Sequence, residues 1–254
     1  MTRGARSICD LSQGAGAPTQ KIAVRTRSIP RRSFTPELLR SLHALADRMI
    51  SEDVEHFRIH AETSDVVHVY ERADTGATVG FQFWRTAAMD LRDCRVVIGG
   101  KLRIEPEFRR RALHLRSSIR FYLENQLRHP GTRFYFLAVA SLFGFVSIAS
   151  ALADYRLFDP SASDAEDRAI RRAFEALAAQ NHHRLDEGTG LFAVGIKITE
   201  QTLAQYSPPY FDRPEARAYI RVNPGWHDGY NVGVWFRFTL ANLARLASTI
   251  ARKR

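Results

Sequence analysis

The residues from Cys94 to Leu127 limit the possible folds most strongly, because they join a strand to a helix through a loop with three consecutive arginines. The apolar residues from Val96 to Ile104 are typical of a strand, and Gly99-Gly100 marks a bulge or a close approach of another group. Pro106 cannot donate a hydrogen bond to a strand ladder and favours an extended Glu105, so the strand should end there.

From Arg111 onward the spacing changes to that of a helix, because apolar residues recur on one face at Leu115, Ile119, Tyr122 and Leu123. The first N–H groups of a helix have no partner within it, and the helix dipole is positive at that end. Three arginines precede this helix, so the free N–H groups and the guanidinium groups can point at the same ligand. The sequence therefore predicts an anion site between the strand and the helix.

Strand, proline, then Arg-Arg-Arg-Ala-Leu-His at the head of a helix resembles the acyl-CoA loop of the GNAT acyltransferase superfamily, Gln/Arg-x-x-Gly-x-Gly/Ala. The pattern falls on Arg109, Ala112 and His114, so alanine and histidine stand where the family has glycine and a small residue. Glycine lets a pyrophosphate approach the backbone closely. The resemblance implies a thioester donor, either acyl-CoA or the acyl-phosphopantetheine of an acyl carrier protein.

The order of expected elements over residues 20–158 agrees with this resemblance. It is a strand, two helices, three strands, a helix and a strand, as in the GNAT core, a mixed α/β sheet flanked by helices. Thr35 and Pro36 open the first helix well. Asp74-Thr75-Gly76 predicts a hairpin turn, and a strand is expected over Arg133–Ala140.

Residues 1–19 are rich in Gly, Ala, Ser and Gln and predict a flexible leader. Residues 159–254 predict an atypical extension that packs on the core. It contains a helix over Ser163–Gln180, a strand over Leu191–Ile198, an ordered aromatic loop over Gln205–Asn231, a strand over Val232–Phe238 and a helix over Leu240–Ile250.

An uncharged run of 20 residues from Phe134 to Ala153 has the length of a membrane span. Its aromatic start favours a sheet, and its many small residues make it a mediocre span. We therefore expect a buried strand followed by a buried helix over Phe143–Leu152, with a membrane anchor as the competing interpretation.

Charge and cysteine content restrict the class of protein. The net charge is +10, but residues 1–35 hold seven of the 37 basic side chains against one acidic residue, so the rest of the chain is only weakly basic. That distribution disfavours nucleic-acid binding. Cys9 and Cys94 form no disulfide framework, and the N-terminus has no apolar core of signal-peptide length. We expect a cytoplasmic protein.

Acyl transfer to an amine needs a base for the amine proton and an acid for the leaving thiolate. Glu105, at the end of the expected strand, is the candidate base; the alternative is a surface carboxylate paired with Arg103 or Arg109. Tyr155 lies where the resemblance implies a tyrosine acid, and the alternative is a packing role at the edge of the core. His114 is a further candidate that could cap the pocket, act as a base or simply pack.

The resemblance places the donor against Ile104 and Arg109–Ala112. Arg109, Arg110 and Arg111 cannot all face one side of a helix, so one or two should meet a phosphate and the rest solvent. Glu52, His56 and His60 share one helix face, but the spacing lacks a clear third ligand and predicts a surface stripe rather than a metal site. His182-His183 and the His227-Asp228 pair are isolated and equally weak. No nucleophile elbow, phosphate loop or dinucleotide fingerprint occurs in the sequence.

These patterns predict an N-acyltransferase with a small-molecule amine as acceptor. If the acyl chain is carrier-borne, the basic strip over Lys101–Arg120 should dock an acidic carrier protein, as the resemblance to N-acyl amino acid and acyl-homoserine synthases implies. The aromatic residues over Tyr206–Tyr230 could roof a pocket. The alternatives are a non-catalytic binding or regulatory protein with this fold, and a membrane-anchored basic protein.

Overall fold

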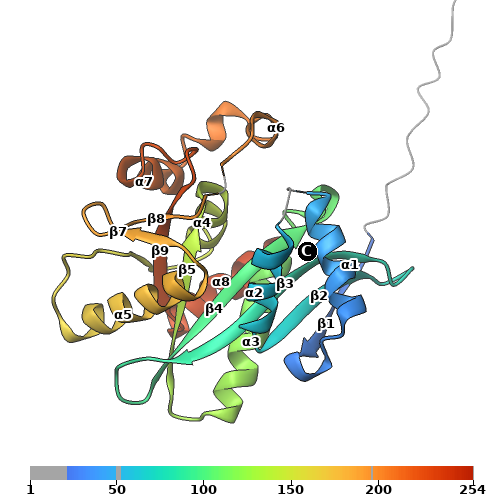
Figure 1. Cartoon of the computed structure of the whole chain (residues 1–254), viewed down its shortest axis with the longest axis horizontal. Coiled ribbons are helices and arrows are strands. Elements are labelled where there is room, and N and C mark those ends of the chain that lie inside the picture. The colour runs from blue at the N-terminus through green and yellow to red at the C-terminus, as the bar shows by residue number, and fades with distance from the viewer. Residues whose placement is uncertain (1–21, 50–52, 196, 254) are drawn as a thin grey trace, which may run out of the picture.

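The computed structural model describes residues 22–49, 53–195 and 197–253, and its strands form one mixed sheet flanked by helices (Figure 1). The strand order is β1-β2-β3-β4-β5-β9-β8-β7, and β6 pairs with β9. Among these pairs only β4 and β5 are parallel. The predicted mixed α/β class is confirmed. The predicted leader, residues 1–19, lies outside the described residues.

The first half of the chain follows the predicted order of elements. Thr35 caps α1, since its Oγ1 accepts a hydrogen bond from the Leu38 N–H at 3.2 Å. The hairpin turns at Asp74–Gly76 as expected. The elements are β1 (Val24–Pro30), α1 (Pro36–Asp47), α2 (Val54–Glu62), β2 (Val66–Arg72), β3 (Thr78–Ala88), β4 (Cys94–Ile104), the 3-10 turn η2 (Pro106–Phe108), α3 (Leu113–Arg128), β5 (Arg133–Ala140) and α4 (Leu142–Ala149).

The uncharged run from Phe134 to Ala153 is a strand and a helix of the domain. β5 lies between β4 and β9 in the sheet, and α4 begins two residues after β5 ends. Leu142, Phe145 and Val146 of α4 are buried in the core. No helix among the described residues is long and apolar enough to span a bilayer.

After α4 the chain returns to the same sheet, on both sides of the boundary predicted at residue 158. β9 pairs with β5 from Tyr135↔Arg237 to Ala140↔Val232, so the sheet crosses the predicted boundary without a break. The elements are β6 (Arg156–Leu157), α5 (Ala165–Gln180), β7 (Arg184–Asp186), β8 (Leu191–Ala193), α6 (Glu200–Leu203), the 3-10 turn η3 (Pro208–Tyr210), α7 (Pro214–Val222), β9 (Tyr230–Arg237) and α8 (Leu240–Arg252).

Two expectations for this half were wrong. The region expected to be a loop contains α7, which starts at Pro214 and buries Ala216 and Tyr219 on one face. The Tyr219 hydroxyl donates to the Ala140 carbonyl at 2.9 Å and holds α7 to the end of β5. β8 also ends at Ala193, earlier than expected, two residues before Gly195 at φ +73°.

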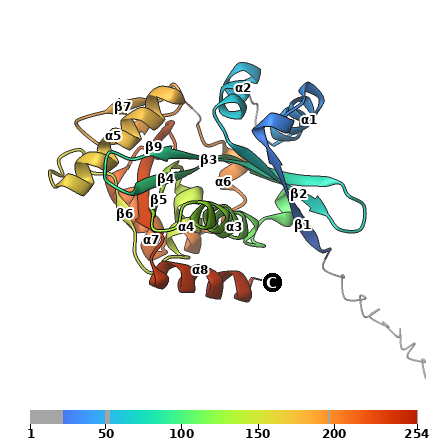
Figure 2. The same ribbon diagram turned by 90° about the horizontal axis from the view of Figure 1, so that it is seen from below.

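The helices cover both faces of the sheet, which Figure 2 shows from the side. α1, α2 and α5 lie on one face, and α3, α4 and α8 lie on the other. The larger core lies under α3, α4, α7 and α8, while α1 with α2 and α5 each cover a separate apolar cluster on the opposite face. The first residues of β4 and the second half of α3 therefore pack in different apolar clusters, on opposite faces of the sheet.

Candidate functional site

The strands β4 and β5 separate part-way along the sheet. They pair from Cys94↔Arg133 to Ile98↔Leu137 and no further. Beyond Ile98, β4 continues to Ile104 and pairs only with β3, while β5 continues to Ala140 and pairs with β9. The edge of β4 over 99–104 that faces β5 consequently has no strand partner among the described residues, and its backbone groups can bind an extended ligand.

This free edge leads to the start of α3. Glu105 and η2 follow β4, and then the backbone takes positive φ at Arg110 (+68°) and at Ala112 (+53°), the residue that precedes the first turn of α3. No side chain caps α3 and its first turn has no acidic residue, within the described chain. The first N–H groups of α3 are thus left for a ligand, and an anion suits them. Ala112, at the position where the resembled motif has glycine, adopts the left-handed conformation that glycine favours.

The three arginines of this loop have separate environments. Arg109 donates through Nε to the Ile104 carbonyl at 3.0 Å and through Nη1 to Oε1 of Gln205 at 2.8 Å. Arg111 donates to the Ile22 carbonyl, and its guanidinium lies 4.7 Å from the centroid of the Phe108 ring. Arg110 is exposed and makes no hydrogen bond or ion pair with the described residues. Of the three, Arg110 is therefore the one available to a phosphate without breaking an existing contact.

The separated strands, the loop after β4 and the order of elements agree with the core that the sequence resembles. The topology of the sheet and the β4–α3 connection give the chain an architecture that resembles the GNAT core.

Comparison with known proteins adds distant likenesses only. No family model matches the chain, and no curated protein does. Arabidopsis thaliana NAA60 in complex with acetyl-CoA has a TM-score of 0.38 at 10% identity, covering 85% of this chain and 99% of that one. Escherichia coli ElaA has a TM-score of 0.37 at 13% identity, covering 56% and 95%. Glucosamine-6-phosphate N-acetyltransferase from Arabidopsis thaliana has 0.34 at 14%, covering 50% and 88%.

Glu105 lies at the junction of β4 and the GNAT-like loop. Its Oε1 pairs with Nη2 of Arg48 at 3.1 Å, and its side chain is 27% exposed. The partner is thus on α1's C-terminal end, not one of the two arginines expected from the sequence. A carboxylate that faces an arginine can still accept a proton from a bound amine, but its position is set by that ion pair.

Tyr155 and His114 lie among the residues of the core under α4. The Tyr155 ring packs edge-on against Phe145 at 5.4 Å, and burial, with the negative charge of Glu215, raises the pKa of its phenol. His114 bonds through Nε2 to Oγ of Ser147 at 3.0 Å and so joins α3 to α4. Burial lowers the pKa of His114 to about 4, so it is neutral at pH 7.

A group of stacked aromatic side chains lies between the first turn of α4 and the residue that binds the loop after β4. Phe143, the second residue of α4, stacks on Tyr206 with ring centroids 3.9 Å apart and planes 12° apart. Phe143 also contacts Tyr210 and Trp226. The neighbouring Gln205 holds Arg109. These contacts place the predicted aromatic region beside the GNAT-like loop.

The structure also assembles a cluster that the sequence did not predict. His56 and His60 of α2 lie with His183, which follows α5, and with Lys101 of β4. We call these four residues the histidine cluster. The surface stripe expected from the sequence is wrong for His60. Burial and the positive charge of Lys101 lower the pKa of His60 to about 2. Glu52, the third residue of the expected stripe, lies outside the described residues.

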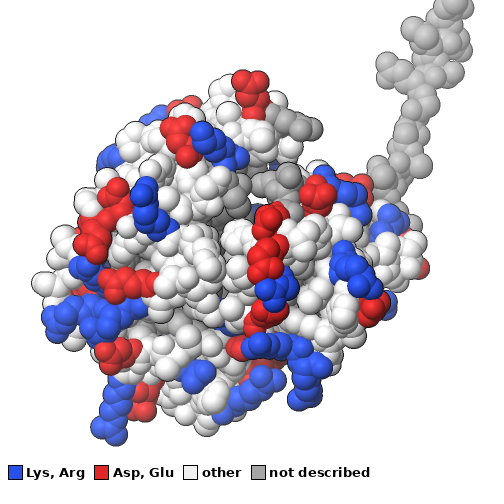
Figure 3. Space-filling view, in the orientation of Figure 1, with Lys and Arg blue, Asp and Glu red and all other residues white. Residues whose placement is uncertain are grey.

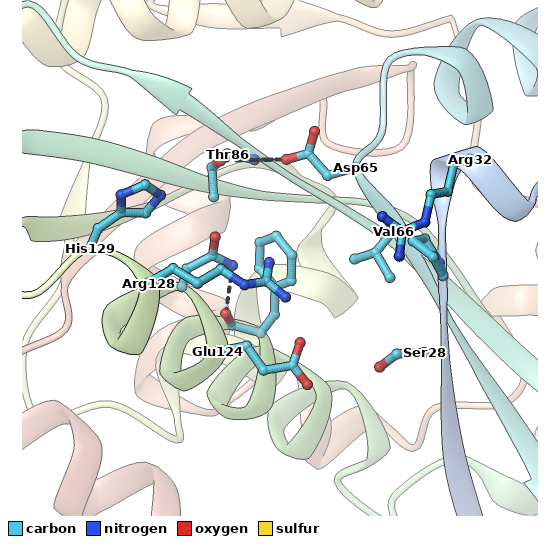
Figure 4. A pocket seen from close by; sticks show the side chains of 11 residues that line it. Ser28, Arg32, Asp65, Val66, Thr86, Glu124, Arg128 and His129 are labelled. Atoms are coloured by element: carbon cyan, nitrogen blue, oxygen red, sulfur yellow. Dashed lines mark hydrogen bonds between the residues drawn. The ribbon is translucent and has the colours of Figure 1, made fainter.

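A cavity of about 510 Å³ opens away from the separated strands (Figure 4). Its lining comes from β1, from the start of β2 and from the C-terminal half of α3, and includes Arg32, Asp65, Glu124 and Arg128. Phe121 is among the lining residues, and Thr86 is held by Asp65. The loop between β4 and α3, where the sequence predicts an anion site, lies at the opposite, N-terminal end of α3. This cavity is therefore separate from the candidate acyl site.

Proposed function

We propose that this protein transfers an acyl group from a thioester to an amine. The observation that carries the proposal is the free edge of β4 over 99–104, which runs directly to the uncapped N-terminus of α3. The pantetheine arm of an acyl-CoA bears amide groups and can bond to such an edge as a strand would, while the pyrophosphate of the CoA would meet Arg110 and the N–H groups of α3.

The candidate chemistry needs three functions near the thioester. Backbone N–H groups of the free β4 edge would polarise the carbonyl. Glu105 is the predicted base, and Tyr155 is the predicted acid for the leaving thiolate. Burial raises the pKa of Tyr155, so its phenol is protonated at neutral pH. His114 is neutral and bonded to Ser147, which favours the packing role over the catalytic one.

The charges around the loop favour a CoA donor over a carrier protein. In the predicted basic strip, Lys101 is buried and Arg120 is bonded to Glu124 and to the Thr26 carbonyl. Arg109 and Arg111 are also bonded within the protein. On the face shown in Figure 3, basic and acidic side chains are interspersed. An acidic carrier protein would gain more from a continuous basic patch than this strip offers.

Thermal unfolding with added ligand tests the proposal. CoA, acetyl-CoA and a long-chain acyl-CoA are each titrated into the full chain. A ligand that binds only the folded protein adds about 2.7 kcal/mol at 100 times its Kd. For a protein of this size that shifts Tm by about 5–11 °C.

Arg110→Ala should weaken CoA binding about 10-fold or more, because a charge-assisted contact to a phosphate is lost. Arg128→Ala, at the other end of α3, is the matched control and should leave binding unchanged. No stabilisation by any of the three thioesters or by CoA would refute a CoA donor. Binding without transfer to any amine, and unaffected by Glu105→Gln, would instead favour the non-catalytic alternative.

A further inference from the structure

The histidine cluster lies directly on β4 at the point where β4 leaves β5. The last parallel pair is Ile98↔Leu137, and Gly100 is two residues further on. A Cβ at Gly100 would lie 3.3 Å from Nδ1 of His60, so the imidazole packs against the β4 backbone itself. Lys101 has φ +45° in the irregular part of the β3–β4 pairing, and its Nζ lies 3.3 Å from Nδ1 of His56.

The third imidazole arrives from the other half of the chain. His183 follows α5, and its ring centroid lies 6.4 Å from that of His56. Figures 1 and 2 show α2 and α5 on the same face of the sheet, with β4 between them. Nδ1 of His183 is buried and has no hydrogen-bond partner among the described residues. A buried polar nitrogen without a protein partner can pair with a group of a bound ligand.

The charges that face this cluster are positive. Burial, Lys101 and the neighbouring histidines, with Arg85 of β3, all lower the pKa of His60. Burial, His56, Lys101 and His182 lower the pKa of His183 to about 4. Arg85 is itself buried and has Asp65 as a distant counter-charge, and the acidic Glu55 acts on the exposed His182. At neutral pH His60 and His183 are therefore uncharged, and Lys101 and Arg85 are positive charges that act on His60.

We propose that the histidine cluster is the acceptor site, that His183 takes the amine proton there in place of Glu105, which is paired with Arg48, and that the acceptor is a weakly basic amine. This inference rests on the proposed thioester site. The field that keeps the imidazoles neutral would also disfavour an ammonium ion, so an amine whose conjugate acid is weak is admitted most easily. An α-amine has a reference pKa of about 7.7–8.0, whereas a lysine-type amine has about 10.4.

In the step itself the amine lone pair attacks the thioester carbonyl, and a C–N bond forms as the C–S bond breaks. The amine proton passes to Nδ1 of His183 and then to solvent. The thiolate takes a proton from the predicted acid Tyr155 and leaves as the thiol, and solvent returns a proton to the Tyr155 phenolate. The products are an amide and the free thiol, and no other reactant is needed.

The experiment measures transfer by mass spectrometry, with whichever acyl-CoA stabilises the protein most. L-phenylalaninamide presents one α-amine and N-acetyl-lysine one ε-amine, and each is followed from about pH 6 to pH 9, a range that spans the reference pKa of the α-amine and lies below that of the ε-amine. We expect the wild type to favour the α-amine about 10-fold or more at neutral pH. His183→Ala should lose about 100-fold in kcat/KM, the usual loss for a general base, with unchanged acyl-CoA binding, and added imidazole should restore part of it.

His182→Asn is the matched control, because His182 is the adjacent, exposed residue with φ +55° that asparagine tolerates; it should stay within about twofold, since a surface change leaves the site intact. His183→Gln keeps a polar side chain without a titratable nitrogen and should be as inactive as His183→Ala. Retained activity in either His183 variant, a preference for the ε-amine, or acyl-CoA binding without transfer to either probe would overturn the inference. If the wild type binds no acyl-CoA, that result would instead refute the proposed function.

Discussion

Ser117 is the residue whose loss should most directly loosen α3, the helix that follows the predicted anion site. It lies in the second turn of α3, and its Oγ accepts from the Trp84 indole N–H at 2.7 Å and bonds to Nδ1 of His68 at 2.6 Å. All three side chains are buried, with exposed fractions of 1%, 1% and 0% for Ser117, Trp84 and His68. One hydroxyl therefore ties α3 to both β2 and β3.

Ser117→Ala leaves two buried polar groups without this partner. Each unsatisfied group costs about 1–3 kcal/mol, which gives about 2–6 kcal/mol for the indole N–H and the imidazole nitrogen together. Alanine is a better helix former than serine by about 0.5 kcal/mol, which offsets a small part. The expected loss of unfolding free energy is about 2–5 kcal/mol.

Urea unfolding at neutral pH measures this loss as a lower midpoint with an unchanged slope. The matched control is Ser118→Ala, on the same helix and 6% exposed, whose hydroxyl has no hydrogen bond within the described chain. That control should change stability by less than about 1 kcal/mol. If both variants lose the same amount, the bonds of Ser117 do not hold α3 as argued.

Two further predictions concern stability. Burial lowers the folded-state pKa of His68, His114 and His183 to about 4, so the unfolded chain takes up protons at a higher pH than the folded protein does. The free energy of unfolding is therefore highest above about pH 6.5 and falls as the pH drops from there through 4. For His68 alone this loss is about 3 kcal/mol. A urea midpoint that is flat between about pH 7 and pH 4.5 would contradict this. Gly233→Ala should cost about 2–3 kcal/mol in thermal unfolding or prevent folding, because the new Cβ would lie 2.6 Å from the Cβ of Phe158 in the packed centre of β9; a loss below about 0.5 kcal/mol would show that this strand can shift.

Local patterns were enough for the first half of the fold. The cap of α1 at Thr35, the hairpin at Asp74–Gly76 and the change of period after Pro106 each depend on residues a few positions apart, so the sequence carries them directly. The uncharged run over 134–153 could likewise be divided correctly, because aromatic residues come first and small residues follow. The same locality explains why the strand-to-helix loop and its three arginines were visible at once.

The candidate site depends on contacts that no local pattern records. Arg109 is bonded to Gln205, 96 positions away, and His56 lies beside His183 from the far half of the chain. Which arginine remains exposed and which residue pairs with Glu105 follow from such contacts. So does the insertion of β9 beside β5, which leaves β4 with a free edge.

The sequence by itself therefore determined the elements of the first half of the chain and their order, and it predicted the anion site after β4, because periodicity, caps and turns are short-range properties of the backbone. Only the tertiary structure decided where β4 and β5 separate and which imidazoles meet there. Strand pairing and burial bring distant residues together, and the burial that keeps His60 and His183 neutral exists only once α2, α5 and β4 are packed.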